Sequence, residues 1–477
     1  MTGREFVRGR LGAVSAASPL AVAAGIEALA NGGNAVDAAI AAQAVLTVVM
    51  PEACGLGGDA LLLVNDGRTV TAVNGTGAAA AGATEAATDG GASVTVPGLP
   101  QAWTETSSRW GRLPLREVLA AAIALAEQGA AASAATVAAA NAQRERLVRG
   151  GAGEWAWLTA APGDLVRQPI LAQSLGAIAA DGDRAFYAGA YADAIAGAVA
   201  RTGGHLAGTD LAQHATPVLT PISVAWSGHT VHVQPPMSQG VLLALALSAI
   251  EEGSFSGGSA ADLVALIGAV FTHRDDVAEG TALLERPLGS APATPGSGPR
   301  AYLHTAGVAT ADQHGMVVSS LVSVFDDFGS AVFVPEGGFV LNNRAGGFTS
   351  GHNAFRPGSR PVHTLAPAMT TTASSTTALA TPGADGQVQT LLQVLCRVRD
   401  GRSLSDAITA PRWRCEDGQV LVEDDHCEIG DLSDHGCDVQ ILPAGDDRFG
   451  AVVCAGVDDD GPFCIADHRR GTACEAA

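Results

Sequence analysis

The sequence of 477 residues predicts a layered α+β fold, and two observations support this prediction. Strand patterns are accompanied by helical patterns that are segregated around them. A loop rich in Pro, Gly and Ser, from Pro287 to Arg300, divides the chain shortly before Thr305. Segregated helices and strands bury their apolar faces by stacking in layers. We therefore expect two stacked sheets between helix layers, with Thr305 at the centre.

The first two expected elements are helices. Ser18 is typical of an N-cap and Pro19 of a first helical turn, and apolar residues follow at helical spacing. Asn34 then caps a second helix, and Asp37 stands three residues later, as in a capping box. This second helix, Val36 to Val48, is apolar almost all round, so we expect it to be buried.

Further elements follow from periodicity and turn residues. The segment from Pro114 to Val199 is mostly helical in pattern. Before Thr305 the expected strands are Ala60 to Val64, Thr69 to Val73, Val94 to Pro100, Ile222 to Trp226 and Thr230 to Gln234, followed by a buried helix from Val241 to Ile250. After it we expect strands Val308 to Ala311 and Met316 to Val324, a hairpin at Thr370 to Thr377 and a helix near Gln387 to Arg397.

Composition excludes several function classes. The net charge is −21 with only 27 Lys and Arg residues, so a nucleic acid is not an expected partner. No run of about 18 uncharged apolar residues is present, so no membrane partner is expected. The first residues, Met1 to Gly12, are polar and resemble no secretory signal, which predicts a cytoplasmic protein.

The cysteines and a glycine cluster argue against a cofactor. Seven of the eight cysteines lie between Cys396 and Cys474 without a CxxC pair, so no metal site is expected. Reduced thiols fit this better than disulfides, although disulfides remain the alternative. The cluster Gly55 to Gly58 lacks the lysine and the glycine order of phosphate-binding loops. Close packing of backbone beneath a site is the preferred interpretation.

Thr305 is the candidate nucleophile. It would open a strand directly after a loop that can be cut, and a new N-terminal threonine carries a hydroxyl and an amine on one residue. The amine has an ordinary pKa of roughly 7.7–8.0, so it can accept the hydroxyl proton near neutral pH. Taken alone, a threonine at the start of a strand is ordinary, and the surrounding motifs change that judgement.

These landmarks resemble the γ-glutamyltransferase family of N-terminal-nucleophile hydrolases over nearly the whole chain. The segment Gly32 to Ala39 reads as the family's GGNAVDAA motif. Further ordered matches are Gly55-Leu56-Gly57-Gly58, Val96-Pro97-Gly98, Pro235 to Gly240, Phe328-Gly329-Ser330, Leu341-Asn342-Asn343, Pro357 to Pro361, Thr381-Pro382-Gly383, and Asp467 with Arg469 and Arg470. The resemblance implies a four-layer αββα sandwich.

The resemblance also implies a catalytic apparatus. Self-cleavage between His304 and Thr305 would give segments 1–304 and 305–477, which associate as one folded unit. Ser323 falls where a second hydroxyl contacts the nucleophile. The N–H groups of Gly383 and Ala384 fall at the oxyanion hole. If the resemblance is set aside, the simpler interpretation of Ser323 is an ordinary strand serine, and that of Gly383 is a residue of a tight turn.

The substrate pocket departs from the family pattern. The family's carboxylate-binding arginine aligns with Thr76, an asparagine with Phe325, and the amine-binding aspartate with Gly347. Two family serines align with His363 and Thr364. Because each lost charged contact is worth roughly 1.5–3 kcal/mol, a γ-glutamyl substrate should bind poorly.

Two other side chains are new candidates for substrate binding. Arg344 offers a bidentate carboxylate site, against the alternative of a surface salt bridge. His363 offers a hydrogen bond or a titrating group, against the alternative of a turn histidine. The family's Thr-Thr-His opening is also changed, to Thr305-Ala306-Gly307.

Three functional hypotheses result, and classical glutamyl transfer is a further alternative that turnover of a γ-glutamyl anilide would support. The leading one is a self-processed threonine hydrolase that cleaves a small acidic or oxo-acid amide through an acyl-enzyme. Its closest rival hydrolyses a carbon–carbon bond next to a keto acid, as relatives in bacterial natural-product pathways do. The third is an unprocessed binding protein without enzymatic activity, which the altered residues Ala306 and Gly307 favour.

Overall fold

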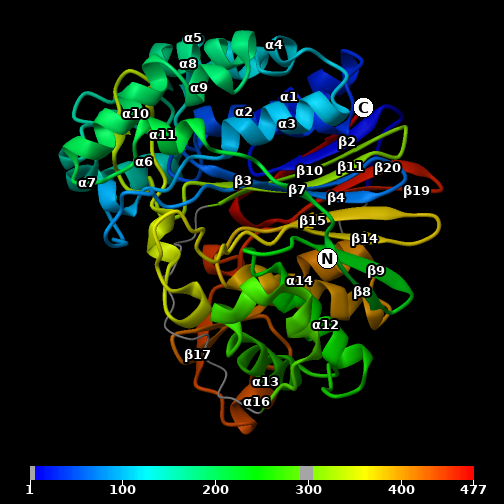
Figure 1. Cartoon of the computed structure of the whole chain (residues 1–477). Coiled ribbons are helices and arrows are strands. Elements are labelled where there is room, and N and C mark those ends of the chain that lie inside the picture. Colours follow the sequence, from blue (N-terminus) through cyan, green and yellow to red (C-terminus); the bar gives the residue numbers. More distant parts are fainter. Residues whose placement is uncertain (1–5, 290–304) are drawn as a thin grey trace.

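The structure is a computed structural model that describes residues 6–289 and 305–477. Two seven-stranded sheets stack face to face, with one group of helices above them and another below (Figure 1). The arrangement is a four-layer αββα sandwich, as the resemblance implies.

The two sheets are largely antiparallel and mix strands from both ends of the chain. The first has the order β21-β2-β10-β11-β3-β4-β7 and the second β1-β20-β19-β15-β14-β9-β8. Strands of the first sheet are β2 (Gly12–Ala16), β3 (Asp59–Asn65), β4 (Val70–Gly75), β7 (Val218–Leu219), β10 (Ala306–Asp312), β11 (Val317–Ser323) and β21 (Ala473–Ala476). Strands of the second are β1 (Val7–Arg8), β8 (Ile222–Trp226), β9 (His229–Val233), β14 (Ala368–Thr371), β15 (Thr376–Ala380), β19 (Val453–Asp458) and β20 (Gly461–Ala466).

The helices form the two outer layers. The layer on the first sheet holds α1 (Pro19–Ala30), α2 (Ala35–Val49), α3 (Leu99–Trp110), α4 (Leu115–Val118), α5 (Ala120–Gln128), α6 (Ala134–Ala142), α7 (Arg144–Arg149), α8 (Pro169–Asp181), α9 (Arg184–Tyr187), α10 (Ala190–Arg201) and α11 (Gly208–Ala212). The layer on the second holds α12 (Gly240–Glu251), α13 (Ala260–Phe271), α14 (Gly386–Arg399), α15 (Leu404–Thr409) and α16 (Ile429–Asp434).

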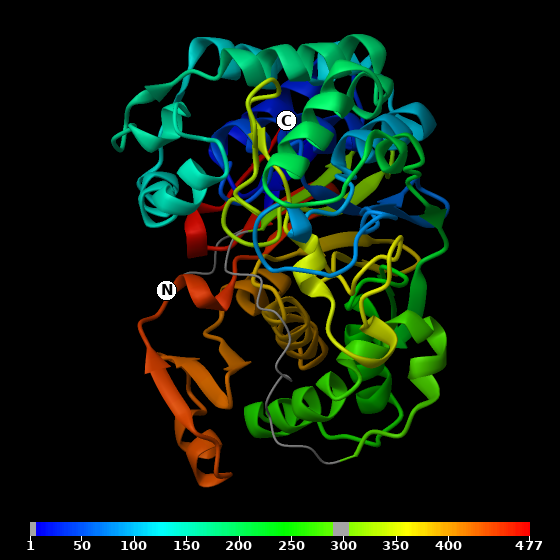
Figure 2. The same ribbon diagram turned by 60° about the vertical axis from the view of Figure 1, so that its left-hand side comes forward.

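Three small sheets complete the fold. They pair β5 (Ala130–Ala131) with β6 (Leu165–Val166), β12 (Phe333–Val334) with β13 (Phe339–Val340), and β16 (Trp413–Glu416) with β17 (Gln419–Glu423) and β18 (Val439–Leu442). In Figure 2 the orange segment that carries the last of these sheets lies at the edge of the molecule, beside the lower helices.

Apolar residues separate the four layers. One cluster joins α1 and α2 to the first sheet, and another joins α12, α13 and α14 to the second. A third, small cluster lies between the sheets and includes Ala309, Ala311, Ala378 and Ala455. Strand β10 contributes to this cluster and is buried along its whole length. The candidate nucleophile Thr305 immediately precedes β10, so a fully buried strand positions it.

The predicted caps at the start of the chain are confirmed. The Ser18 side chain accepts a hydrogen bond from the N–H of Leu20 at the start of α1. Asn34 and Asp37 form a capping box at the start of α2, and every residue of α2 is buried.

One predicted strand is wrong. The segment from Val94 to Pro100 pairs only through an isolated bridge between Thr95 and Ala79, and α3 already begins at Leu99. Pro100 stands at the first turn of α3, where a missing N–H costs nothing, so the proline ends the extended segment and starts the helix.

Candidate active site

Four polar residues form a row across neighbouring strands of the first sheet. Ser323 on β11 lies directly opposite Asp59 on β3. The same ladders place Thr305 next to Ser323 on one side, because Ala306 pairs with Val322, and Thr76 next to Asp59 on the other, because Gly75 pairs with Ala60. Directly opposed residues point to the same face of a sheet, with strands about 4.8 Å apart. This active-site row therefore gathers Thr305, Ser323, Asp59 and Thr76 at one end of the sheet.

Thr305 and Ser323 are in direct contact. The Thr305 hydroxyl donates to the Ser323 Oγ at 3.2 Å, and Thr305 is 5% exposed. The N–H of Phe325 donates to the same Ser323 Oγ at 3.0 Å. Ser323 is thus held by its own loop while it orients the Thr305 hydroxyl.

Phe325 occupies an unusual backbone conformation beside this pair. Its φ is 86°, in the left-handed region that costs a residue with a side chain about 1–3 kcal/mol. The buried Phe325 ring packs against Ala384, and the Arg344 guanidinium lies 4.3 Å from the ring centroid. Neighbouring N–H groups anchor the loop, since Val324 donates to the Ala53 carbonyl at 3.1 Å. The surrounding contacts therefore sustain a strained backbone that brings the ring against Arg344 and Ala384.

The turn at Gly383 and Ala384 has two successive left-handed residues, with φ of 121° and 50°. Within residues 6–289 and 305–477, neither N–H donates to a backbone or side-chain acceptor. The Gln239 Nε2 donates to the carbonyls of Ala384 at 2.9 Å and Thr364 at 2.8 Å. Gln239 therefore fixes the turn while the two N–H groups stay open, an arrangement that suits an oxyanion hole.

Arg344, Asp59 and His363 form a buried polar cluster. The Arg344 Nε donates to the Asp59 Oδ2 at 3.0 Å, and both side chains are fully buried. The His363 Nε2 lies 3.3 Å from the same oxygen. Arg344 is therefore not a surface salt bridge, and His363 is a buried residue of the site.

Electrostatics settle the protonation states in this cluster. Burial, reinforced by the charge of Arg344, lowers the pKa of His363 to about 4, so its ring is neutral at pH 7. Burial alone raises the pKa of Asp59, but the hydrogen bond from His363 and the charge of Arg344 outweigh it and lower that pKa. Asp59 is therefore ionised.

Thr76 and Thr364 lie at the edge of this arrangement. The Thr76 hydroxyl donates to the Asn74 Oδ1 at 2.6 Å, and its carbonyl accepts from the Arg360 Nε at 3.0 Å. Thr364 is buried and contributes its carbonyl to Gln239. The predicted substrate contacts of both residues stay predictions.

The glycine cluster packs tightly under the row. A Cβ on Gly58 would lie 2.5 Å from the Ser323 carbonyl oxygen, and one on Gly57 would lie 2.2 Å from the Val340 carbonyl oxygen. The predicted close packing of the backbone at this cluster is confirmed. The predicted cleavage point, between His304 and Thr305, lies outside the described residues on its His304 side.

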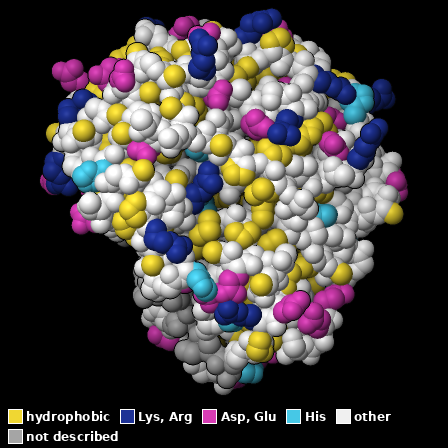
Figure 3. Space-filling model, viewed as in Figure 1, with side chains coloured by type: hydrophobic (Ala, Val, Ile, Leu, Met, Phe, Trp, Pro, Cys, Tyr) yellow, Lys and Arg dark blue, Asp and Glu magenta, His cyan; other side chains and the backbone are white. Residues whose placement is uncertain are grey.

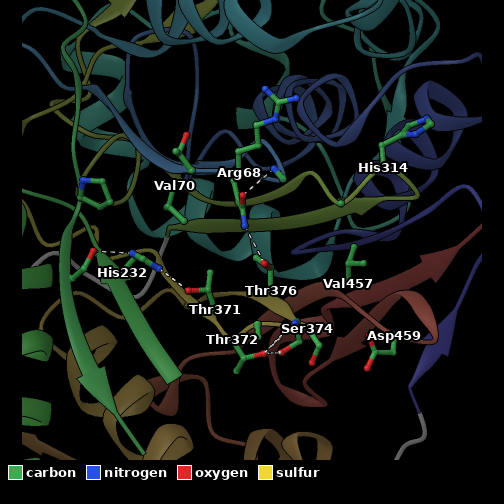
Figure 4. A pocket seen from close by; sticks show the side chains of 18 of the residues that line it. Arg68, Val70, His232, His314, Thr371, Thr372, Ser374, Thr376, Val457 and Asp459 are labelled. Carbon is green, nitrogen blue, oxygen red and sulfur yellow. Dashed lines mark hydrogen bonds between the residues drawn. The ribbon is translucent and has the colours of Figure 1, made fainter. Parts of the chain in front are cut away.

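A large groove lies at the other end of the sheets. It measures about 780 Å³ and is lined mainly by hydroxyl side chains around His232, whose ring bonds Ser223 at 2.8 Å and Thr371 at 2.9 Å (Figure 4). Asn65, which lines the groove, stands at the opposite end of β3 from Asp59, six residues or roughly 20 Å away at about 3.3 Å per residue. The groove is separate from the active-site row.

Surface and metal-binding features add little to the site. On the face in Figure 3 basic and acidic side chains are interspersed. Among the described helices none is long and apolar enough to cross a membrane. No disulfide joins the eight cysteines, all of which lie within the described residues. Asp276, Glu279 and His352 cluster near the surface, but Arg286 already pairs with both acids.

The family model described as gamma-glutamyltranspeptidase matches residues 21–271 and 291–477. The chain belongs to the γ-glutamyltranspeptidase family. The glutathione hydrolase-like YwrD proenzyme of Bacillus subtilis (strain 168) is 31% identical, with 93% of this chain and 94% of the relative covered. The oxamate amidohydrolase proenzyme of Klebsiella pneumoniae is 30% identical, with 83% of each covered.

A solved structure supports the same assignment. The cephalosporin acylase from Bacillus halodurans superimposes with a TM-score of 0.88 at 27% identity, covering 100% of this chain and 98% of that one. The fold is that of N-terminal-nucleophile hydrolases, and the chain is a hydrolase of the γ-glutamyltranspeptidase type.

Two residues of this γ-glutamyltranspeptidase-type site were missed by sequence reasoning. Asp59 follows the glycine cluster and is the first residue of β3. An acidic residue at the first position of a buried strand is unusual, and this was the sequence signal that could have identified it as a site residue. Gln239 lies within the family-like segment Pro235 to Gly240, where the turn drew attention but the side chain did not. Both act through contacts with residues distant in the sequence, which local patterns do not reveal.

Proposed function

We propose that the protein is a self-processing threonine hydrolase that cleaves a small acidic or oxo-acid amide through an acyl-enzyme. The observation that carries the proposal is the 3.2 Å hydrogen bond between the hydroxyls of Thr305 and Ser323, at the entry to β10. The open N–H groups of Gly383 and Ala384 lie in the same site, linked to Thr305 through Phe325 and Ser323.

Self-processing would begin with Thr305. Its Oγ attacks the carbonyl carbon of the preceding residue, His304, and the peptide nitrogen leaves as the new α-amine of Thr305. The resulting ester is hydrolysed by water, which gives segment 1–304 a carboxylate and segment 305–477 a free N-terminus. Ser323 orients the attacking hydroxyl.

Turnover would use the same hydroxyl. The Thr305 amine takes the hydroxyl proton while Oγ attacks the amide carbonyl, and the N–H groups of Gly383 and Ala384 stabilise the oxyanion. The amine then gives its proton to the leaving nitrogen, which departs as ammonia or an amine. Water hydrolyses the acyl-threonine and restores the enzyme.

The substrate class is supported by what the pocket lacks and by what relatives are named for. Thr76 and Gly347 stand where the family pattern has its charged contacts for a γ-glutamyl group. One relative is named for oxamate amidohydrolysis, and a solved relative is named as a cephalosporin acylase. A small acidic amide fits both the altered pocket and the first of these names.

Product analysis tests the reaction type. Purified protein is incubated with oxamate, malonamate, succinamate and 2-oxoglutaramate, and in parallel with a panel of 2-keto acids. We expect ammonia and the matching dicarboxylate or oxo acid from at least one amide, and no turnover by Thr305→Ala. Carbon–carbon cleavage of a keto acid without ammonia release would favour the rival hydrolase, and no turnover by an uncut chain would favour a binding protein.

A further inference from the structure

The Arg344 guanidinium has two nitrogens without partners. Its Nε pairs with Asp59, but within the described residues the two terminal nitrogens, Nη1 and Nη2, have no hydrogen-bond partner although the side chain is fully buried. Leaving a buried charged donor unsatisfied costs more free energy than leaving a neutral one unsatisfied. Buried polar groups are nearly always hydrogen-bonded, so these two nitrogens call for a partner such as a ligand or an ordered water.

Two unpartnered acceptors lie in the same cluster. The Asp59 Oδ1 is buried and has no donor in the described part of the chain, and the same holds for the His363 Nδ1. Because a carboxylate only accepts hydrogen bonds, the His363 Nε2 carries the proton toward Asp59, and the Nδ1 of the neutral ring is an acceptor. The cluster thus offers two donors on Arg344 beside two acceptors.

We propose that Arg344 binds the carboxylate of the substrate, while Asp59 and His363 accept hydrogen bonds from a donor group of the same small molecule. This assignment rests on the proposed function and narrows its substrate to short compounds that carry both a carboxylate and a hydrogen-bond donor. Monoamides of short dicarboxylic acids have this pattern, since the amide supplies the donor.

The position of Phe325 argues that the molecule is short. Its ring contacts both the Arg344 guanidinium and Ala384, a candidate oxyanion residue. Contacting groups lie about 4 Å apart, so the carboxylate site and the oxyanion hole are separated by little more than one ring. In the active-site row Asp59 is also the direct neighbour of Ser323, which contacts Thr305. These short separations favour a substrate with a short chain between its carboxylate and the scissile carbonyl.

Binding measurements test this assignment without turnover. The probes are glycolate and 3-hydroxypropionate, which carry a carboxylate and a hydroxyl donor but no amide, and their neutral counterparts ethylene glycol and 1,3-propanediol. Titration calorimetry on the purified wild-type protein is expected to show at least tenfold tighter binding of the hydroxy acids. In Arg344→Met this preference is expected to disappear.

The matched variant is Asp59→Asn, which breaks the same ion pair from the other side. It leaves Arg344 charged and removes the competing carboxylate, so we expect the preference for hydroxy acids to persist or increase. If Arg344→Met does not fold because Asp59 is left unpaired, the double variant Asp59→Asn/Arg344→Met removes both charges and is compared with Asp59→Asn alone.

Three results would overturn the assignment. The first is equal binding of hydroxy acids and diols by the wild type. The second is an unchanged preference for hydroxy acids in folded Arg344→Met. The third is loss of that preference in Asp59→Asn, which would make the Arg344–Asp59 ion pair purely structural. These outcomes are independent of the proposed reaction. A preference that depends on Arg344 without amide turnover would refute the reaction only, and turnover without that preference would refute the assignment only.

Discussion

Glu52 lies behind the loop that carries Phe325, and its replacement by Gln gives a quantitative test of the buried electrostatics. The side chain is 1% exposed, Thr136 donates to its Oε1 at 3.0 Å, and its Oε2 has no partner among the described residues. Burial, with a smaller contribution from Asp327, raises its pKa from 4.5 to about 7. The Glu52 carbonyl also accepts the Phe328 N–H at 3.0 Å, so the residue supports the active-site loop directly.

The sign of the effect follows from proton linkage. The folded chain keeps a proton on Glu52 up to pH 7, whereas the unfolded chain loses it near pH 4.5, so stability is lost as pH rises through this interval. Between pH 5 and pH 8 the loss amounts to about 2.5 kcal/mol, at 1.36 kcal/mol per pKa unit. Glu52→Gln keeps the shape and the acceptor for Thr136 but has no such proton, so it avoids this loss.

Scanning calorimetry at pH 5 and pH 8 measures the difference. The unfolding entropy is about 2.1 cal/mol/K per residue, so 2.5 kcal/mol corresponds to about 2–3 °C in Tm for this chain. We therefore expect the Tm of Glu52→Gln, measured against that of wild type, to be about 2–3 °C higher at pH 8 than at pH 5. Glu127→Gln, on the exposed surface of α5, is the control and is expected to change neither value. Parallel pH profiles for Glu52→Gln and wild type would refute the assignment of a buried, protonated Glu52.

Three further substitutions test the frame of the site. Ser323→Ala removes the hydrogen-bond partner of the Thr305 hydroxyl. Because such a bond is worth about 1 kcal/mol, self-cleavage should slow about 5-fold or more. The control is Ser319→Ala, since Ser319 is buried on the same strand but donates to the Leu379 carbonyl, and this variant should not slow self-cleavage. Gln239→Leu leaves two carbonyls unpaired and should lower kcat for any amide that is turned over; a reduced Tm with unchanged kcat would contradict its positioning role. Asn34→Ala removes the α2 cap and should lower stability by about 1 kcal/mol in a denaturation experiment, and an unchanged Tm would count against the capping box.

Much of the frame could be predicted because it depends on local signals. Caps such as Ser18 and Asn34 act within three residues, and the hairpin from β10 to β11 follows from two apolar runs with turn residues between them. The strand predicted at Val94 to Pro100 was wrong because it also relied on local signals alone. A proline-rich segment is compatible both with an extended chain and with the start of a helix. Only packing against neighbouring elements decided between them.

The site was predicted in part, because its residues come together through sheet register. Thr305 and Ser323 were paired by the resemblance, and the hydrogen bond between them agrees with that pairing. The burial of Arg344 was undecidable from sequence, because it depends on Asp59, which is 285 residues away in the chain. The strained backbone of Phe325 likewise depends on contacts that no local pattern encodes.

The central claim is that Thr305 frees itself and then acts as the nucleophile. Its most direct test is the intact mass of purified wild-type protein beside Thr305→Ala. The account predicts two wild-type fragments that meet at His304 and Thr305, with masses that sum to the full chain plus one water, and a single uncut chain for the variant. A single full-length chain in both proteins would contradict the self-processing mechanism and leave a binding role as the better explanation.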